Sequence, residues 1–438
     1  KYDQSTTLLI NFLDQAEKLS KLPPQSSPYM AYYTLGYNYI KQNKYDQAES
    51  YFKQTIDGIR TQRINIKNKY IMDNIYGDAW LRYGDCLFKL NKYDAALAAY
   101  DQTVKRQSNG FVYAQFQQAI IFGLTGSLEK KVRKLEGLTK NYPNSTYADN
   151  ALLELGAALT ELGRLNQAIK PLNQLVTDYS STSELVVDAL LRLGLLSYNL
   201  GDTKTALNYY QAVFDKNPNP EQSAEALTSI EEIYVQDLGQ PEAYVSFLEE
   251  KSGVSLGQRS KDSLNFKAAE AQFENGNYER AAKAYQRYLE QFPTGIHALS
   301  ASFRMGESYL AEGQYEAALA GYEKVIERGP SPYYAPACQK AAIISYNYIE
   351  DFEKSTEYFR RWTKVAQSEE DELTAQIGGM EAAFRSKNSQ AVLDLSDQVF
   401  QSARSTKDQK GKAMYYRGKV ALEKGQFDQA LNAFNEVN

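Results

Sequence analysis

Side chains that could carry out catalysis are scarce in this sequence. His297 is the only histidine and lies in a linker after Pro293, so histidine triads, multi-histidine metal sites and histidine-cysteine pairs cannot be assembled. The acidic run 369–372 lies where a helix is expected to begin, and there it complements the helix dipole rather than forming an acid-base pair. No glycine-rich phosphate loop follows a strand, because no strand is expected. We therefore expect no catalytic, metal or cofactor site, no enzyme, and a solvated His297.

Charge and composition argue against two further classes of protein, those that bind nucleic acid and those that span a membrane. The chain has 49 basic and 54 acidic residues, a net charge of -5 and no long run of either sign, which gives little support to nucleic-acid binding. No stretch reaches the roughly 18 apolar residues of a membrane span. Cys86 and Cys338, the only cysteines, lie too far apart along the chain's repeats for a disulfide, so we expect two small buried hydrophobic residues.

One short pattern recurs along the chain and reveals internal repeats. It contains an aromatic residue, an acidic residue and then an alanine two positions later, at residues 44–48, 92–96, 277–281, 314–318 and 426–430. Reading outward from each copy gives a unit of two helices joined by a short turn. Several units end in a proline, which cannot continue a helix: Pro143, Pro218, Pro293 and Pro330.

Three positions in each unit show how its two helices are expected to pack. A small residue in the first helix lets the second helix approach closely: Gly36, Gly84, Ala119, Gly156, Gly194, Ala269, Gly306, Gly379 and Gly418. Twelve residues later the second helix carries an alanine, for example Ala48 and Ala96. Four residues after that comes a large apolar side chain on the same helical face, for example Phe52 and Tyr100, which fills the gap to the next unit.

This arrangement resembles the tetratricopeptide-repeat (TPR) family. Residues 77–110 match its pattern closely, with Trp80, Tyr83, Gly84, Ala96 and Tyr100 at the expected places. In this register the chain contains ten complete units and a clipped eleventh, starting at residues 29, 77, 112, 149, 187, 224, 262, 299, 336, 372 and 411. The resemblance implies an all-α fold, a right-handed superhelical solenoid of antiparallel helix pairs.

Departures from the repeat pattern predict the domain organisation. We expect the second half of a truncated repeat in residues 1–28, an arm of five repeats in 29–223 and an arm of five repeats in 262–438. In the unit between the arms, residues 224–261, Glu231 replaces the small residue, Pro241 opens the second helix and a polar linker follows. This unit is either a hinge or merely a degenerate repeat. Residues 60–74 lengthen the first repeat, and neither end shows a polar cap, which predicts a piece of a longer protein.

By the same resemblance, a partner is expected in the groove lined by the first helices. Aromatic residues mixed with both charge signs suit recognition of a protein or an extended peptide. The candidate residues are Tyr33, Tyr37, Arg82, Tyr113, Phe116, Arg192, Phe266, Lys267, Phe303, Arg304, Lys340, Tyr348, Tyr415 and Tyr416. The chaperone-binding TPR subset uses a Lys and Asn pair on one first helix. Tyr33 and Tyr37 stand in the first repeat instead, so that assignment is rejected.

A stripe of three cations on the C-terminal arm is a narrower hypothesis. Lys267, Arg304 and Lys340 recur at intervals of 37 and 36 residues and would form a ladder suited to an acidic or carboxylate-bearing segment. The alternative is that Glu270 and Glu307 neutralise Lys267 and Arg304 as i,i+3 pairs. Lys340 has no acidic neighbour one turn away, which predicts an uncompensated charge there.

The long linkers between repeats suggest a location. Residues 141–156 resemble repeats of Gram-negative envelope proteins of the Tol-Pal coordinator and outer-membrane assembly lipoprotein types. This resemblance implies an interaction scaffold of the cell envelope, in the periplasm, with a cytoplasmic location as the alternative. The other function left open is a regulatory or substrate-presenting arm of a larger enzyme or secretion component. The oligomeric state is not indicated by the sequence.

Overall fold

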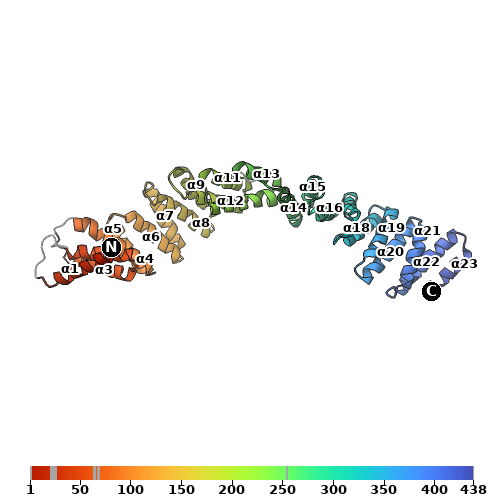
Figure 1. Cartoon of the computed structure of the whole chain (residues 1–438), viewed down its shortest axis with the longest axis horizontal. Helices are drawn as coiled ribbons and strands as arrows, with labels where there is room; N and C mark the ends of the chain where they lie inside the picture. Colours follow the sequence, from red (N-terminus) through yellow and green to blue (C-terminus); the bar gives the residue numbers. More distant parts are fainter. Residues whose placement is uncertain (1, 20–26, 63–65, 67–69, 253–254, 438) are drawn as a thin grey trace. The chain divides into compact units, whose positions relative to one another are not determined.

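A computed structural model of the chain describes residues 2–19, 27–62, 66, 70–252 and 255–437. Across these residues the elements are helices, with no strand among them (Figure 1). Within each unit most successive helices pack against each other, as α4 does against α3 and α5, which makes a stack of antiparallel pairs. The predicted all-α fold of repeated helix pairs is thereby confirmed. The chain divides into two compact units, one up to Ala226 and one from Leu227 onward.

Unit 1 contains the N-terminal repeats. Its first helices are α2 (Pro28–Lys41), α4 (Tyr76–Lys89), α6 (Phe111–Leu124), α8 (Ala148–Glu161), α10 (Val186–Asn199) and α12 (Pro220–Glu231), whose last residues belong to unit 2. Its second helices are α1 (Tyr2–Ala16), α3 (Tyr45–Gln62), α5 (Tyr93–Lys105), α7 (Leu128–Asn141), α9 (Leu165–Asp178) and α11 (Thr203–Val213), the last extended by the short helix η2 (Phe214–Lys216). Helix α1 packs on α2, and its place as the second half of a truncated repeat stays a prediction.

Unit 2 contains the remaining repeats. Its first helices are α14 (Gln258–Glu274), α16 (Ala298–Ala311), α18 (Tyr334–Asn347), α20 (Glu369–Arg385) and α22 (Lys407–Glu423). Its second helices are α13 (Pro241–Phe247), α15 (Tyr278–Gln291), α17 (Tyr315–Glu327), α19 (Phe352–Val365), α21 (Ser389–Gln401) and α23 (Phe427–Asn435). Buried side chains lie between successive helices rather than in one central core.

The two helices of each repeat are joined by the same kind of turn. Gly126, for example, has φ 71°. Its N–H donates to the Gly123 carbonyl, and the Ser127 N–H donates to that of Phe122, so the last carbonyls of the helix are satisfied. The corresponding left-handed residues are Asn43, Asn91, Gly163, Gly201, Gly239, Gly276, Gly313, Glu350, Lys387 and Gly425. Reversal of the chain at these points brings each second helix back along the first.

The small residue of the first helix faces a large ring or branched chain on the second helix of its own repeat, a contact that was not predicted from the sequence. A Cβ added to Gly84 would lie 2.8 Å from the Tyr100 ring, and one added to Gly156 would lie 2.6 Å from Leu172. Tyr100 and Leu172 are fully buried. The absence of a side chain at the glycine therefore sets the distance between the two helices.

Both irregular repeats depart from regular helix at the positions that differ from the repeat pattern. The predicted lengthening of repeat one includes an 18-residue α3, a part outside the described residues, and a π-helical turn η1 (Ile71–Ile75) before α4. In repeat six the π-helical turn η3 (Glu232–Asp237) follows α12, and a further π-helical turn, η4 (Leu248–Ser252), follows α13. Pro241 is the first residue of α13, as predicted. That residues 224–261 act as a hinge stays a prediction.

The two cysteines are buried and unpaired, as predicted. Burial raises the pKa of the Cys86 thiol to about 12 and that of Cys338 to about 11, so almost no thiolate exists at neutral pH. We expect neither cysteine to react with a thiol reagent at about pH 8 in the folded protein, and both to react after unfolding in guanidinium. Labelling followed by mass spectrometry measures this, and rapid reaction of either thiol in the folded state would show that its repeat opens readily.

Candidate functional site

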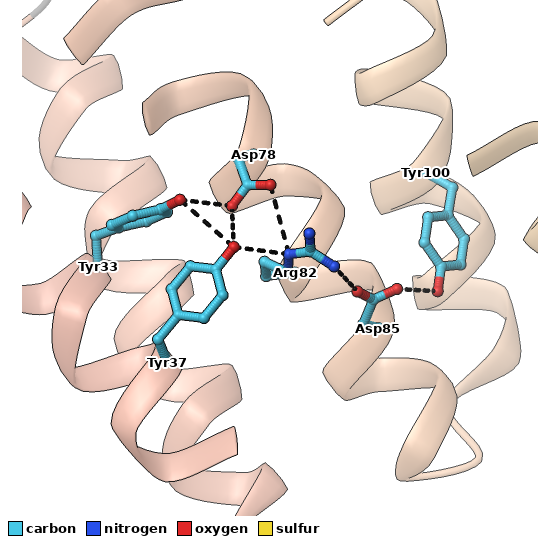
Figure 2. A network of polar contacts seen from close by, with 6 residues as sticks. All are labelled: Tyr33, Tyr37, Asp78, Arg82, Asp85 and Tyr100. Atoms are coloured by element: carbon cyan, nitrogen blue, oxygen red, sulfur yellow. Dashed lines mark hydrogen bonds and ion pairs between the residues drawn. The ribbon is translucent and has the colours of Figure 1, made fainter. Parts of the chain in front are cut away.

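Two tyrosines on α2 and one carboxylate on α4 form the centre of the candidate site (Figure 2). Tyr33 and Tyr37 lie one helical turn apart, so both hydroxyls point from the same face of α2. They donate to the same oxygen of Asp78, at 2.6 and 2.5 Å. The carboxylate thus fixes both rings at the junction between the first helices of repeats one and two.

Arg82 extends this network along α4. Its Nε donates to the Tyr37 hydroxyl at 2.8 Å and lies 3.4 Å from Asp78, while its Nη1 donates to Asp85 at 2.9 Å. The other oxygen of Asp85 accepts from the hydroxyl of Tyr100, which comes from α5, at 2.8 Å (Figure 2). The network therefore connects two first helices to the second helix that supports them.

Burial and neighbouring charges shift the pKa values of several of these groups. Burial and the hydrogen bond to Asp78 raise the pKa of Tyr33, so its hydroxyl remains a donor. Desolvation alone would lower the pKa of Arg82, but Asp78, Tyr37 and Asp85 outweigh it and the net pKa is raised. Burial raises the pKa of Asp85, and its bonds to Tyr100 and Arg82 oppose that rise. With two carboxylates and one guanidinium, the network carries one net negative charge when both carboxylates are ionised.

Two hollows lie beside this network. The smaller, about 340 Å³, is lined by Tyr33, Asp78, Arg82 and Leu81. The larger, about 850 Å³, is lined mainly by uncharged residues, including Met72, Val112, Tyr113 and Tyr147. Both include residues 74, 109 and 110 in their walls, so they adjoin. A continuous depression therefore runs from α2 across α4 and α6 to the start of α8.

Tyr113 and Tyr147 contribute aromatic rings to the wall of the larger hollow, and Phe116 packs behind Tyr147. Tyr113 and Phe116 of α6 both contact Tyr147, with ring centroids 5.3 and 5.8 Å apart. Across the hollow, Arg106 lies over the ring of Tyr76 at 5.2 Å. Sequence reasoning missed Tyr147 because it lies just before α8, outside the first-helix positions that line a TPR groove. An available signal was its place directly before a first helix, where Tyr333 and His297 also stand.

In unit 2 the predicted aromatic residues mostly pack against other rings. Phe266 is stacked on His297 with centroids 4.3 Å apart, so His297 is not the freely solvated side chain that was predicted. Phe303 lies between Tyr322 and Tyr333, at 5.6 and 5.2 Å. These contacts join each first helix to the linker that follows its repeat. Little of the surface of the Phe266 and Phe303 rings is therefore left for contact with a binding partner.

The predicted uncompensated charge of Lys340 is wrong, and so are the i,i+3 pairs. Each cation is instead paired with a carboxylate of the preceding repeat: Lys267 with Glu231 at 2.8 Å, Arg304 with Glu270 at 3.5 Å and Lys340 with Glu307 at 3.5 Å. Adjacent first helices lie side by side, so the carboxylate within reach of each cation is the one on the neighbouring helix. The cationic ladder is therefore neutralised along its length.

The same three carboxylates also receive tyrosine hydroxyls from second helices. Tyr285 donates to Glu270 and Tyr322 donates to Glu307, both across 15 residues of sequence. Burial, with Glu231 as a further cause, raises the pKa of Tyr244 to about 12. Phenol, carboxylate and cation thus recur in the same order through three repeats. The arrangement couples neighbouring repeats and leaves no strong unpaired charge on these residues.

The remaining predicted groove residues are not brought together. Arg192 is exposed on α10 and forms no ion pair with another described residue. Tyr348 is half exposed and stacked on Tyr315 at 3.9 Å, at the end of α18. Tyr416 is stacked on Phe384 at 4.3 Å, and Tyr415 is exposed beside it. These four residues remain candidates for partner binding, but they do not form a common site.

In the part of the chain that the structure describes, no group of three or more histidine, cysteine or acidic side chains is placed to hold a metal ion. No described helix is both long enough and apolar enough to cross a membrane.

Comparisons with protein families identify the repeats. Residues 266–335 and 412–438 match models of the tetratricopeptide repeat. Residues 38–231 match the family described as T7SS, ESX-1 secretion system protein EccA1, N-terminal domain. No curated protein matches the chain. The chain thus carries tetratricopeptide repeats, whereas the narrower resemblance to Gram-negative envelope proteins stays a prediction.

Several solved structures are similar over part of the chain. A tetratricopeptide repeat protein from Parabacteroides merdae is 18% identical, with a TM-score of 0.30 over 60% of this chain and 96% of that one. The TPR2AB domain of yeast Sti1, solved as a complex with pHSP90, is 16% identical, with a TM-score of 0.32 over 63% and 100%. The P58(IPK) TPR domain is 16% identical, with a TM-score of 0.25 over 83% and 99%.

Proposed function

We propose that this chain is a protein-interaction scaffold whose unit 1 binds an extended segment of a partner protein across α2, α4, α6 and the start of α8. The observation that carries the proposal is the pair of adjoining hollows beside the network of Tyr33, Tyr37, Asp78 and Arg82. Tetratricopeptide repeats are in general protein-binding modules. The other stripe predicted for binding, in unit 2, is neutralised by its own carboxylates.

The lining of the two hollows indicates the chemistry of the segment. The larger hollow has mainly uncharged walls with several rings, which suits an apolar or aromatic side chain as an anchor. The smaller hollow offers the edges of Asp78 and Arg82, which can pair with main-chain N–H and C=O groups. Because hydrogen bonds already hold Tyr33 and Tyr37, little side-chain entropy is lost when a segment binds.

A second candidate function has its own observation. The match to the N-terminal domain of a secretion-system protein covers residues 38–231, which include both hollows except for the part lined by Tyr33. This favours the alternative that unit 1 is a substrate-presenting arm of a secretion component, with the same groove as its binding site. The location in the cell envelope is a proposal that rests only on the resemblance of the linkers.

Site-specific cross-linking tests the groove. We expect benzoylphenylalanine at Val112 or Tyr147 to cross-link the same partner in cells, whereas the same residue at Lys170, exposed on α9, gives none. Tyr113→Ala combined with Phe116→Ala should reduce the cross-link at Val112 by roughly tenfold, because aromatic anchors carry much of such binding. Equal products from Lys170 and Val112 would refute the groove. A partner that is a secreted substrate would favour the second candidate.

A further inference from the structure

A third hollow of unit 1 lies between α6 and α7. Its volume is about 410 Å³, and its walls include Phe122 of α6 and Lys130, Arg133, Lys134 and Gly137 of α7. None of its lining residues lines either hollow of the proposed groove. It is therefore a separate feature of the same unit.

A missing side chain on α7 makes room for this hollow. Residues 130, 134, 137 and 141 follow one another at spacings of four, three and four, so they share one face of the helix. Gly137 lies on this face, and a Cβ added there would meet nothing within 4 Å. Glycine in the middle of a helix lowers its stability, and here no close contact requires it. The space over Gly137 is left open between charged neighbours.

The charges around the hollow are all positive. Lys130, Arg133 and Lys134 form no ion pair with any described residue. Their neighbours differ, because Lys131 is paired with Glu154 and Glu129 is paired with Arg164. Helix α7 has five basic and two acidic residues, a net charge of +3 in a chain with a net charge of -5. Concentrated positive charge around a concave surface attracts anions.

Two further contacts describe the walls. Lys130 lies over the ring of Phe122 with its Nζ 5.7 Å from the centroid, and Tyr142 supplies a second ring. Burial lowers the pKa of Lys134, and Asp101 opposes this only from a distance, being itself 2.5 Å from Lys105. A half-buried ammonium group without a carboxylate partner favours the approach of an anion from outside.

We propose that this hollow is a second docking site, which binds an acidic segment of a partner protein through at least two carboxylates and one apolar side chain. The carboxylates contact Lys130, Arg133 and Lys134, and the apolar side chain occupies the space over Gly137, between Phe122 and Tyr142. The lining of α7 extends from residue 130 to residue 141, roughly 16 Å of helix, which fits an extended segment better than a compact phosphate. The proposal goes beyond the groove and does not depend on it.

The test uses a fluorescein-labelled peptide of alternating Glu and Leu residues, with anisotropy measured at low and moderate salt. Arg133→Gln combined with Lys134→Gln is expected to weaken binding at least tenfold and to reduce the salt dependence. Gly137→Leu keeps every charge and should weaken binding similarly by filling the hollow. Leucine has a higher helix propensity than glycine, so this variant should fold, which circular dichroism checks.

Matched controls decide between specific and general attraction. Lys53→Gln combined with Lys170→Gln removes two charges from exposed positions of other second helices and should leave peptide affinity unchanged. An equal loss in that control, or unchanged binding by Gly137→Leu, would overturn the proposal. Full displacement of the peptide by inorganic phosphate would assign the hollow to compact anions instead. Tyr113→Ala, which alters the groove, should not change the affinity for this peptide. The proposal for the groove and the proposal for this hollow can therefore be refuted independently.

Discussion

Gly84→Val is expected to lower the local stability of the α4–α5 pair by about 3 kcal/mol, through overpacking of a site that has no free volume. A Cβ at this position would lie 2.8 Å from Tyr100, and valine adds two methyl groups beyond it. The ring of Tyr100 cannot turn aside easily, because it is fully buried and its hydroxyl is bonded to Asp85. The two helices must therefore separate, and the bonds of the network beside them must lengthen.

Gly137→Val is the matched control, since it makes the same change in another helix of unit 1. No atom lies within 4 Å of its added Cβ, so we expect a change of less than about 0.5 kcal/mol. Hydrogen exchange read peptide by peptide is the suitable measurement, because repeat arrays open locally rather than in one step. Similar effects at the two glycines would show that helix propensity, rather than the contact with Tyr100, controls this position.

The fold could be predicted because the pattern of small and large residues in each repeat indicates a pair of closely packed helices. The small residue at Gly84 or Gly156 and the large one sixteen residues later follow directly from the sequence, and their contact sets the distance between two helices. Pro241 likewise indicates where α13 begins. The π-helical turns η1 and η3 could not be predicted, because an inserted residue can be absorbed in a helix or in a linker at similar cost.

The positions of some residues of the candidate site could be predicted from the sequence, and the errors share one cause. Sequence periodicity places Tyr33, Tyr37 and Arg82 on first helices, but it does not give the offset between neighbouring helices. That offset decides whether Lys340 meets a carboxylate, and it brings Lys340 to Glu307 of the preceding repeat. It also decides which linker residue reaches Phe116, and that residue is Tyr147. Contacts within a helix follow from spacing, whereas contacts between repeats need the structure.

Arg82→Met should cost about 1.5–3 kcal/mol of local stability, the range for a lost hydrogen bond to a charged group with its partner left buried. The variant keeps most of the aliphatic packing but removes the donor to Tyr37 and to Asp85. The Asp85 carboxylate, which is mostly buried, then keeps its hydrogen bond from Tyr100 but has lost its cationic partner. Lys105→Met is the control: its exposed i,i+4 pair with Asp101 should be worth less than about 0.5 kcal/mol.

The pH dependence separates this explanation from a simple loss of packing. Burial raises the folded-state pKa of Asp85 above the ordinary value of 3.8, and Arg82 is one of the groups that limit the rise. A raised folded-state pKa means that the folded protein binds this proton more tightly, so the contribution of Asp85 to stability is lost as pH rises through that pKa. Without Arg82 the pKa rises further and the loss is larger. The deficit of Arg82→Met relative to the parent protein should therefore be smaller at about pH 4 than at about pH 7.

The double variant Arg82→Met with Asp85→Asn completes the test. Neutral asparagine removes the buried charge, so the double variant should recover part of the stability lost by Arg82→Met, and its deficit relative to Asp85→Asn alone should not depend on pH between about 4 and 7. Hydrogen exchange of α4 and α5 at both pH values gives the comparison. If the deficit of Arg82→Met is the same at both values, or if Asp85→Asn adds to it in full, the stability of this junction comes from packing around Tyr37 and Tyr100 and not from the charged network.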